Sequence, residues 1–153
     1  MGISQISKAS YDVGNEIINT VLNYYLIPLE EKISIKVKGF ISNELNISMR
    51  DLCIISSNIV KNAVDALEDY SGNAGEIKVE VRQGESFWLM RVKNTMMNNN
   101  IILKDGIPVT TKNNSELHGF GIKNIISSVD KYNGEYNYRI ENGYYIAEVY
   151  LKI

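Results

Sequence analysis

Three segments of the chain carry apolar side chains at helical spacing, and each segment predicts a helix. The first runs from Ser10 to Ile27 and stops before Pro28. The second opens at Ser48, and the third begins at Gly119 and ends at Asn133-Gly134. The expected core side of the second helix is Leu52, Ile55, Ile59, Ala63, Ala66 and Leu67, and that of the third is Ile122, Ile125, Ile126 and Val129.

Alternation of apolar and polar residues predicts strands between these helices. Residues 33–37 read as a half-buried strand, with the short apolar piece Phe40-Ile41 as its candidate hairpin partner. Strands at 77–82 and 87–94 follow the second helix. Two closing strands, Glu135–Ile140 and Tyr144–Leu151, are joined through Asn142-Gly143, which is a strong hairpin signal.

The order of these elements predicts an α+β fold, a two-layer sandwich. We expect a mixed, largely antiparallel sheet of about five strands with three helices on one face. The whole chain, residues 1–153, is long enough to form one domain with a real core. The stretch Met96–Ser115 is rich in Asn and shows no clear periodicity, which is typical of a functional lid or a disordered segment.

Composition excludes several classes of partner. The net charge of −2 provides no basic surface for nucleic acid or for an anionic membrane. The single Cys53 excludes an internal disulfide, and we expect it to be a small buried side chain of the second helix. No apolar run is long enough to cross a bilayer, and there is no signal peptide, although a chain opening at Met1-Gly2 could be excised from a membrane parent.

Polar side chains at Asn58, Asn62 and Asp65 recur at helical spacing in a helix that otherwise appears buried. The carbonyl oxygen of Asn62 is a neutral, hard ligand suited to Mg²⁺, which takes its other ligands from water and phosphates. Asn58, one turn earlier, can hydrogen-bond a phosphate or a Mg²⁺-bound water. The alternative for Asn62 is a surface asparagine, and Asp65 can equally be a solvated acid near the helix end.

Asn94 shares a strand face with Met90 and Val92, so we expect its side chain to point inward. A buried amide needs hydrogen-bond partners, and its oxygen could accept from the amino group of adenine. The alternative is an asparagine that only caps the entrance to the loop that follows.

His118-Gly119-Phe120-Gly121 is a candidate phosphate cradle at the start of the third helix. Its glycines let backbone N–H groups approach phosphate oxygens, and the helix dipole adds attraction. His118 can donate to a phosphate or serve as a cap or structural ring. Lys112 can neutralise phosphate charge or be an ordinary exposed lysine.

Taken together, these residues resemble the catalytic ATP-binding domain of histidine kinases in the GHKL ATPase superfamily, most closely the Agr-type sensors of peptide pheromones. NIVKNAVDA (Asn58–Ala66) resembles the N box of that family. TTK (Thr110–Lys112) followed by HGFGIKN (His118–Asn124) resembles its T-S-K…H-G-L-G-L-K-N segment. VKNT (Val92–Thr95) resembles the strand end that replaces D-x-G-x-G in this subgroup, and GNEIIN (Gly14–Asn19) resembles the opening segment.

The resemblance implies a Bergerat-type sandwich that binds ATP and Mg²⁺. It places Asn62 on the metal, Asn58 near the phosphates and Asn94 at the adenine. It implies an ATP lid at residues 96–116. Under this lid, the residues expected at the phosphates are Thr111, Lys112, His118, Gly119, Phe120 and Gly121. The implied catalytic residues are Asn58, Asn62 and Lys112. The D-x-G-x-G box is absent, since Asp105-Gly106 lies too deep in the lid, and the only histidine falls in the glycine-rich box.

The function expected from these residues is transfer of the ATP γ-phosphoryl group to a histidine on a separate dimerisation domain. The domain would belong to a membrane-bound bacterial sensor, lie on its cytoplasmic side without inserting into the membrane, and signal to a response regulator in quorum sensing. Two alternatives remain open. One is a protein-serine kinase of the anti-sigma type on the same fold, and the other is a non-catalytic module for nucleotide binding or docking.

Overall fold

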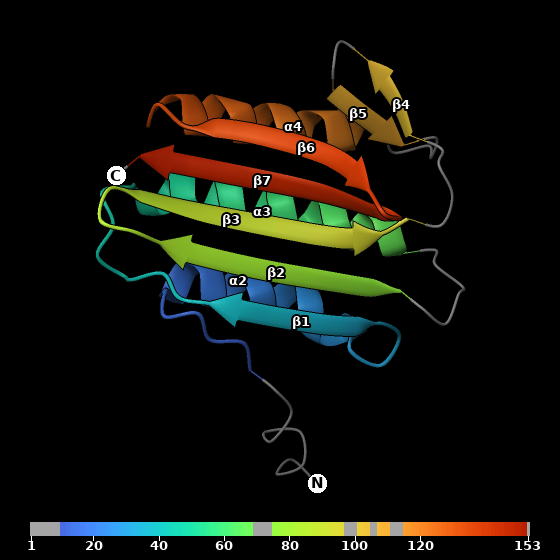
Figure 1. Cartoon of the computed structure of the whole chain (residues 1–153), viewed down its shortest axis with the longest axis horizontal. Helices are drawn as coiled ribbons and strands as arrows, with labels where there is room; N and C mark the ends of the chain where they lie inside the picture. The colour runs from blue at the N-terminus through green and yellow to red at the C-terminus, as the bar shows by residue number, and fades with distance from the viewer. Residues whose placement is uncertain (1–9, 69–74, 97–100, 105–106, 111–114, 153) are drawn as a thin grey trace, which may run out of the picture.

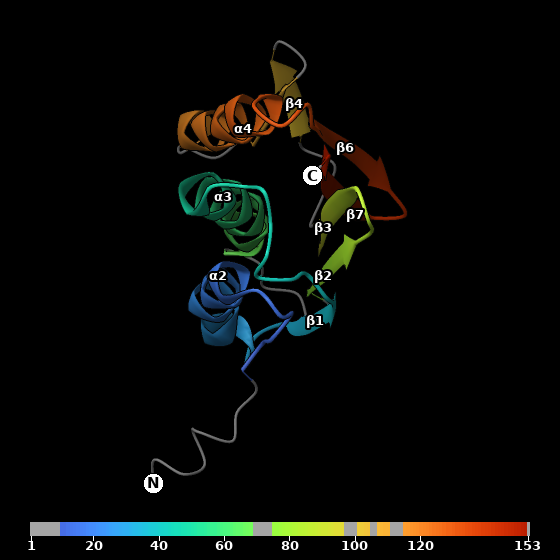
Figure 2. The same ribbon diagram turned by 90° about the vertical axis from the view of Figure 1, so that its left-hand side faces the viewer.

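A computed structural model describes residues 10–68, 75–96, 101–104, 107–110 and 115–152. It consists of two layers, with a five-stranded sheet covered on one face by three helices (Figures 1 and 2). The expected α+β sandwich is therefore confirmed. The helices are α2 (Glu16–Leu26), α3 (Met49–Leu67) and α4 (Ser115–Asp130), and a short 3₁₀ turn, η1 (Ile27–Leu29), follows α2.

The strand order in the sheet is β1-β2-β3-β7-β6. Only β1 and β2 are parallel, and the other neighbours are antiparallel. The strands are β1 (Ser34–Gly39), β2 (Glu76–Gln83), β3 (Phe87–Thr95), β6 (Glu135–Glu141) and β7 (Tyr144–Lys152). The prediction that Phe40-Ile41 pairs with β1 in a hairpin is wrong. Parallel strands need a long crossover, which α3 supplies here, so the chain leaves the sheet after Gly39.

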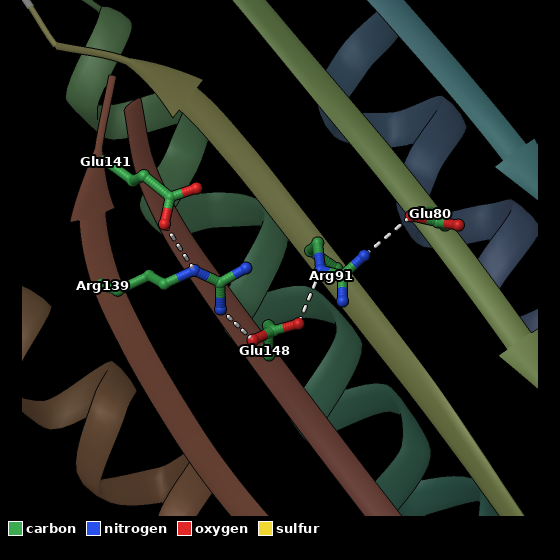
Figure 3. Close-up of polar contacts among 5 residues, drawn as sticks. All are labelled: Glu80, Arg91, Arg139, Glu141 and Glu148. Atoms are coloured by element: carbon green, nitrogen blue, oxygen red, sulfur yellow. Dashed lines mark hydrogen bonds and ion pairs between the residues drawn. The ribbon is translucent and has the colours of Figure 1, made fainter. Parts of the chain in front are cut away.

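The core lies between the helices and the inner face of the sheet. On the central strand β3 the inward residues Trp88, Met90 and Val92 are all buried, as their alternation predicts. The outer face instead carries charged pairs that cross four strands (Figure 3). There Arg91 of β3 pairs with Glu80 of β2 and with Glu148 of β7. The charges are thus matched locally, which suits a sheet with one face in water.

The segment before α2 corrects the prediction of a helix from Ser10. Residues 10–14 are not helical, Gly14 has a positive φ of 89°, and Asn15 caps α2 by accepting from the Ile18 N–H. The segment lies along α2 because two helical asparagines hold its backbone. Asn23 accepts from the Tyr11 N–H (2.7 Å) and donates to its carbonyl (3.0 Å), and Asn19 accepts from the Val13 N–H.

Replacing Asn23 with alanine should destabilise the fold, because it leaves both backbone groups of Tyr11 without their partner. A buried polar group left unpaired costs about 1–3 kcal/mol. Urea unfolding followed by the fluorescence of Trp88, the only tryptophan, measures the change. The control is Asn137→Ala, which removes an exposed asparagine from β6. Equal stability of the two variants would contradict this account of residues 10–14.

The N-terminus of α3 matches its prediction. Ser48 is the N-cap, and its hydroxyl accepts from the Asp51 N–H at 3.0 Å. Its predicted apolar side is buried at five of six positions, Ala66 being half-buried. The prediction that Cys53 is buried is wrong, since its side chain is exposed. Cys53 follows Leu52 by one residue, which turns its side chain about 100° away from the core side.

The stretch from residue 96 to 115 contains regular structure that the sequence pattern did not predict. Strands β4 (Ile101–Lys104) and β5 (Ile107–Thr110) pair in a separate two-stranded sheet. Helix α4 begins at Ser115 rather than Gly119, so both glycines lie inside the helix. A helical glycine costs only about 1 kcal/mol relative to alanine, and the packing of the apolar side of α4 can offset that cost.

The last three elements otherwise follow the sequence. Ile122, Ile125 and Val129 of α4 are buried, but the prediction that Ile126 belongs to the core side is wrong, since its side chain is exposed. Asn142 and Gly143 both have positive φ, as the tight hairpin between β6 and β7 requires. Among the described helices, none is long and apolar enough to cross a membrane.

Candidate functional site

The candidate residues that the structure describes lie at one end of the sandwich. The second half of α3, the first half of α4 and the end of β3 meet there, and the β4–β5 hairpin lies beside α4 at the same end (Figures 1 and 2). Helices α3 and α4 run antiparallel, because the first turn of α3 contacts the residues that follow α4. This arrangement brings the asparagine stripe of α3 to face the glycine-rich segment of α4.

Asn58 and Asn62 converge on the backbone of α4. A Cβ placed on Gly121 would lie 3.1 Å from Oδ1 of Asn58 and 3.6 Å from Oδ1 of Asn62. The amide nitrogen of Asn58 donates to the Ile54 carbonyl at 2.8 Å, which directs its oxygen towards α4. The side chain of Asn62 makes no hydrogen bond within the described part of the chain. Two amide oxygens therefore face the same point on the α4 backbone, and a side chain at position 121 would crowd that of Asn58.

Asp65 does not join these amides. Its carboxylate pairs with Lys61 of the same helix at 2.7 Å, and this hydrogen bond raises the pKa of Lys61. Among the described residues no group of three His, Cys, Asp or Glu side chains could hold a metal ion. The donor set thus fits a metal that arrives with its own phosphate ligands and takes one or two neutral oxygens from the protein, as Mg²⁺ does with a nucleotide. It does not fit a cation bound by protein carboxylates alone.

Asn94 is buried on the inner face of β3, as the alternation predicts, with 3% of its surface exposed. Its amide nitrogen donates to the Thr95 carbonyl at 3.1 Å. Within the described residues its amide oxygen has no hydrogen-bond partner, which leaves an acceptor at the end of the strand. An acceptor held in this orientation suits the amino group of a base.

Five of the predicted phosphate-binding residues lie outside the described residues or are described only in their backbone. Thr111 and Lys112 lie outside the described residues. His118, Gly119 and Phe120 belong to the backbone of α4, but their side chains are not described. Because α4 already starts at Ser115, the glycine-rich box does not form the helix start that was predicted. It instead provides a close approach of α4 to α3 at Gly121.

Sequence reasoning missed two groups, one beside Asn94 and one at the far end of α3. Tyr145 is the β7 neighbour of Asn94 and stacks on Tyr138, with ring centroids 5.7 Å apart; burial raises the pKa of its hydroxyl. At the other end of α3, the carboxylate of Asp51 binds Lys131 and Tyr132. Alternation could have placed Tyr145 inward, but no local pattern reveals a contact that spans 80 residues.

Several solved structures share the fold of this chain. The catalytic domain of histidine kinase ThkA superposes with a TM-score of 0.65 at 16% identity, covering 90% of each chain. The histidine kinase domain of the Erythrobacter litoralis EL346 blue-light activated kinase gives 0.62 at 13% identity, covering 96% of this chain and 66% of that one. The mycobacterial sensor histidine kinase MprB gives 0.59 at 14% identity, covering 90% and 92%.

These likenesses establish the fold, because all three identities are low. Among curated protein sequences, none matches the chain at a significant level. The family model described as GHKL domain, however, matches residues 47–152, which include α3, the whole of β2 to β7 and α4. The chain therefore belongs to the GHKL domain family.

Proposed function

We propose that the chain is the ATP-binding catalytic domain of a sensor histidine kinase. It would pass the γ-phosphoryl group of ATP to a histidine on a separate dimerisation domain. The observation that carries this proposal is the convergence of the Asn58 and Asn62 amide oxygens beside Gly121. Membership of the GHKL family and the fold shared with histidine kinase catalytic domains support it.

The amides have distinct roles in this proposal. Asn62 holds Mg²⁺ through its oxygen, and the bound metal supplies charge neutralisation for the β- and γ-phosphates. One N–H of the Asn58 amide bonds the Ile54 carbonyl and the amide oxygen faces α4, so Asn58 presents an acceptor on that side. An acceptor suits a metal-bound water better than a phosphate oxygen, which also accepts. Of the two roles open to Asn58 from its sequence, this orientation favours the contact with water.

The remaining contacts follow the family resemblance. Asn94 receives the amino group of adenine through its amide oxygen. The lid at residues 96–116 closes over the phosphates, with Thr111 and Lys112 supplying polar and positive groups. The backbone of His118 to Gly121 lies beside the phosphate chain. Catalysis then consists mainly of positioning and charge neutralisation, because the acceptor histidine brings its own nucleophilic nitrogen.

The biological setting is part of the same proposal. The segment VKNT in place of D-x-G-x-G supports an Agr-type sensor, whose upstream part would span the membrane and detect a peptide pheromone. This domain would then lie on the cytoplasmic side of that membrane. Its phosphorylated parent kinase would pass the phosphoryl group to a response regulator.

ATP with Mg²⁺ should raise the melting temperature of the chain, yet be hydrolysed very slowly. A ligand that binds only the folded state stabilises it by RT ln(1 + [L]/Kd). Hydrolysis is slow because Asn58 cannot take a proton from an attacking water, and a positioned base is worth roughly 10²–10⁴-fold. Thermal unfolding and incubation with γ-labelled ATP measure the two effects.

The outcomes separate the three candidate functions. Binding without rapid phosphate release or self-labelling supports the kinase, and transfer of label to a histidine-bearing dimerisation domain completes the test. Transfer to a serine of a partner protein would favour the anti-sigma type of kinase. Absence of any thermal shift or heat of binding at millimolar ATP with Mg²⁺ would favour the non-catalytic docking module, for which the missing D-x-G-x-G box is the supporting feature.

A further inference from the structure

Asp51 is a buried carboxylate that the nucleotide site does not use. It lies in the first turn of α3, with 4% of its surface exposed. Lys131 donates to its Oδ1 at 3.0 Å, and the Tyr132 hydroxyl donates to its Oδ2 at 2.6 Å. These two contacts lower the pKa of Asp51, the hydrogen bond from Tyr132 contributing most. The carboxylate is therefore ionised and fully engaged by the residues that follow α4.

The Tyr132 hydroxyl also accepts from the backbone N–H of Ser48 at 3.0 Å. One hydroxyl thus joins the cap and the first turn of α3. Tyr132 is itself fixed to α4, because its N–H and that of Gly134 both bond to the Val129 carbonyl, at 3.0 and 2.9 Å. We call Ser48, Asp51, Lys131 and Tyr132 the α3–α4 clasp.

The clasp and the nucleotide site lie at opposite ends of the same helix pair. Along α3, Asp51 precedes Asn62 by eleven residues, which is about 16 Å of helix. Along α4, Gly121 precedes Lys131 by ten residues, which is about 15 Å. The two spans are nearly equal, so the clasp and the contact at Gly121 belong to one register of α4 against α3. A slip of one residue would shift α4 by about 1.5 Å and bring a residue with a side chain towards the two amides.

We propose that Asp51 and Tyr132 are positioning residues of the nucleotide site. Their contact sets the register of α4 against α3 and thereby holds Gly121 beside the amide oxygens of Asn58 and Asn62. The inference rests on the proposed function, since it takes this space as the place where phosphates and Mg²⁺ bind. Directional hydrogen bonds to a buried carboxylate suit a register-setting role, because apolar contacts would tolerate a small slip that these bonds do not.

The test is Tyr132→Phe in the full chain, read by amide hydrogen exchange and by titration with Mg²⁺ and ATP. The substitution removes one hydroxyl and leaves the ring in place. We expect exchange at residues 121–126 to become about tenfold faster, which is the effect of losing one hydrogen bond to a charged group. The affinity for ATP with Mg²⁺ should fall several-fold. Both effects appear some 15 Å from the removed atom, where a purely local contact would change nothing.

Tyr11→Phe is the matched control. The Tyr11 hydroxyl also donates to a carboxylate at 2.6 Å, that of Glu30, but it joins the segments that precede and follow α2 rather than α3 and α4. The control should lower the melting temperature by a similar few degrees, yet leave exchange at 121–126 and nucleotide affinity unchanged. Lys131→Ala is a second, milder variant in case Tyr132→Phe does not fold, because the Lys131 side chain is 57% exposed.

Wild-type exchange at residues 121–126 in both clasp variants, with changes confined to residues 48–52 and 128–134, would overturn the inference. The inference would also be overturned if amide exchange at residues 121–126 were equally fast in the Tyr11→Phe control. If the wild-type chain binds no ATP, the proposed function fails. The exchange readout still decides whether the clasp sets the register of α4, so the two failures are distinguishable.

Discussion

Replacing Asn62 with alanine should abolish the Mg²⁺-dependent part of ATP binding while leaving the fold intact. The side chain of Asn62 is half-buried and makes no hydrogen bond to the described residues, so its truncation leaves none of these without a partner. Alanine is also the better helix former, which stabilises the folded state by roughly a few tenths of a kcal/mol. Loss of a metal ligand should weaken binding by at least about 10–100-fold, the range found even for outer-shell residues.

Calorimetric titration with ATP, with and without Mg²⁺, measures this effect, and urea unfolding checks the fold. Asn137→Ala is the control, because it removes an equally sized but exposed amide from the outer edge strand. A variant at Asn62 that keeps the full Mg²⁺ dependence would show that the metal is held elsewhere. A variant that unfolds would show that Asn62 is structural.

The second large effect is expected at Gly121, where stability and function should change in opposite directions. In Gly121→Ala the new Cβ would lie 3.1 Å from Oδ1 of Asn58, closer than most such contacts, and 3.6 Å from Oδ1 of Asn62. The amide oxygens must then yield by a few tenths of an ångström. Helix propensity favours alanine over glycine by about 1 kcal/mol, so the free energy of unfolding should be unchanged or slightly higher.

Nucleotide affinity should nevertheless fall in Gly121→Ala by about tenfold or more, because a methyl group occupies the space that a phosphate or a metal-bound water requires. Ser127→Ala is the matched control on the exposed side of the same helix. It raises helix propensity without approaching α3, so its affinity should equal that of the wild type. Wild-type affinity in Gly121→Ala would show that the space beside Gly121 is not part of the nucleotide site.

The stability and the nucleotide affinity of the Asn62 and Gly121 variants together distinguish a binding role from a packing role. If a residue served packing alone, its replacement would lower the stability of the protein, as large changes in a core do. Asn62 and Gly121 are expected to do the reverse, since each is a poor helix former inside a helix. If both variants behave in this way, the facing positions of Asn62 and Gly121 serve a ligand rather than the fold, as we propose.

The sequence alone predicted the elements whose signals are local. The cap at Ser48, the apolar side of α3 and the turn at Asn142-Gly143 each depend on residues within a few positions of one another. The inward position of Asn94 follows from strand alternation in the same way. The spacing of Asn58 and Asn62 likewise placed both amides on one side of a helix before any tertiary contact was known.

Only the tertiary structure decided features that depend on distant parts of the chain. Residues 10–14 carry a helical pattern, yet they are not helical, because Asn19 and Asn23 offer their backbone better partners than a further helical turn would. Strand β1 pairs in parallel with β2 rather than with Phe40-Ile41, because α3 intervenes as a crossover. Neither choice is visible in a window of a few residues.

The same holds for the site itself. The sequence determined which side chains could bind a nucleotide, since amide oxygens, glycines and helical spacing are properties of the residues themselves. The packing of α4 on α3 decided that Gly121, about sixty residues away, faces Asn58 and Asn62, while Asp51 meets Tyr132 across 81 residues. Such contacts arise from burying the apolar sides of two helices against one sheet, and the register of that packing depends on all three elements at once.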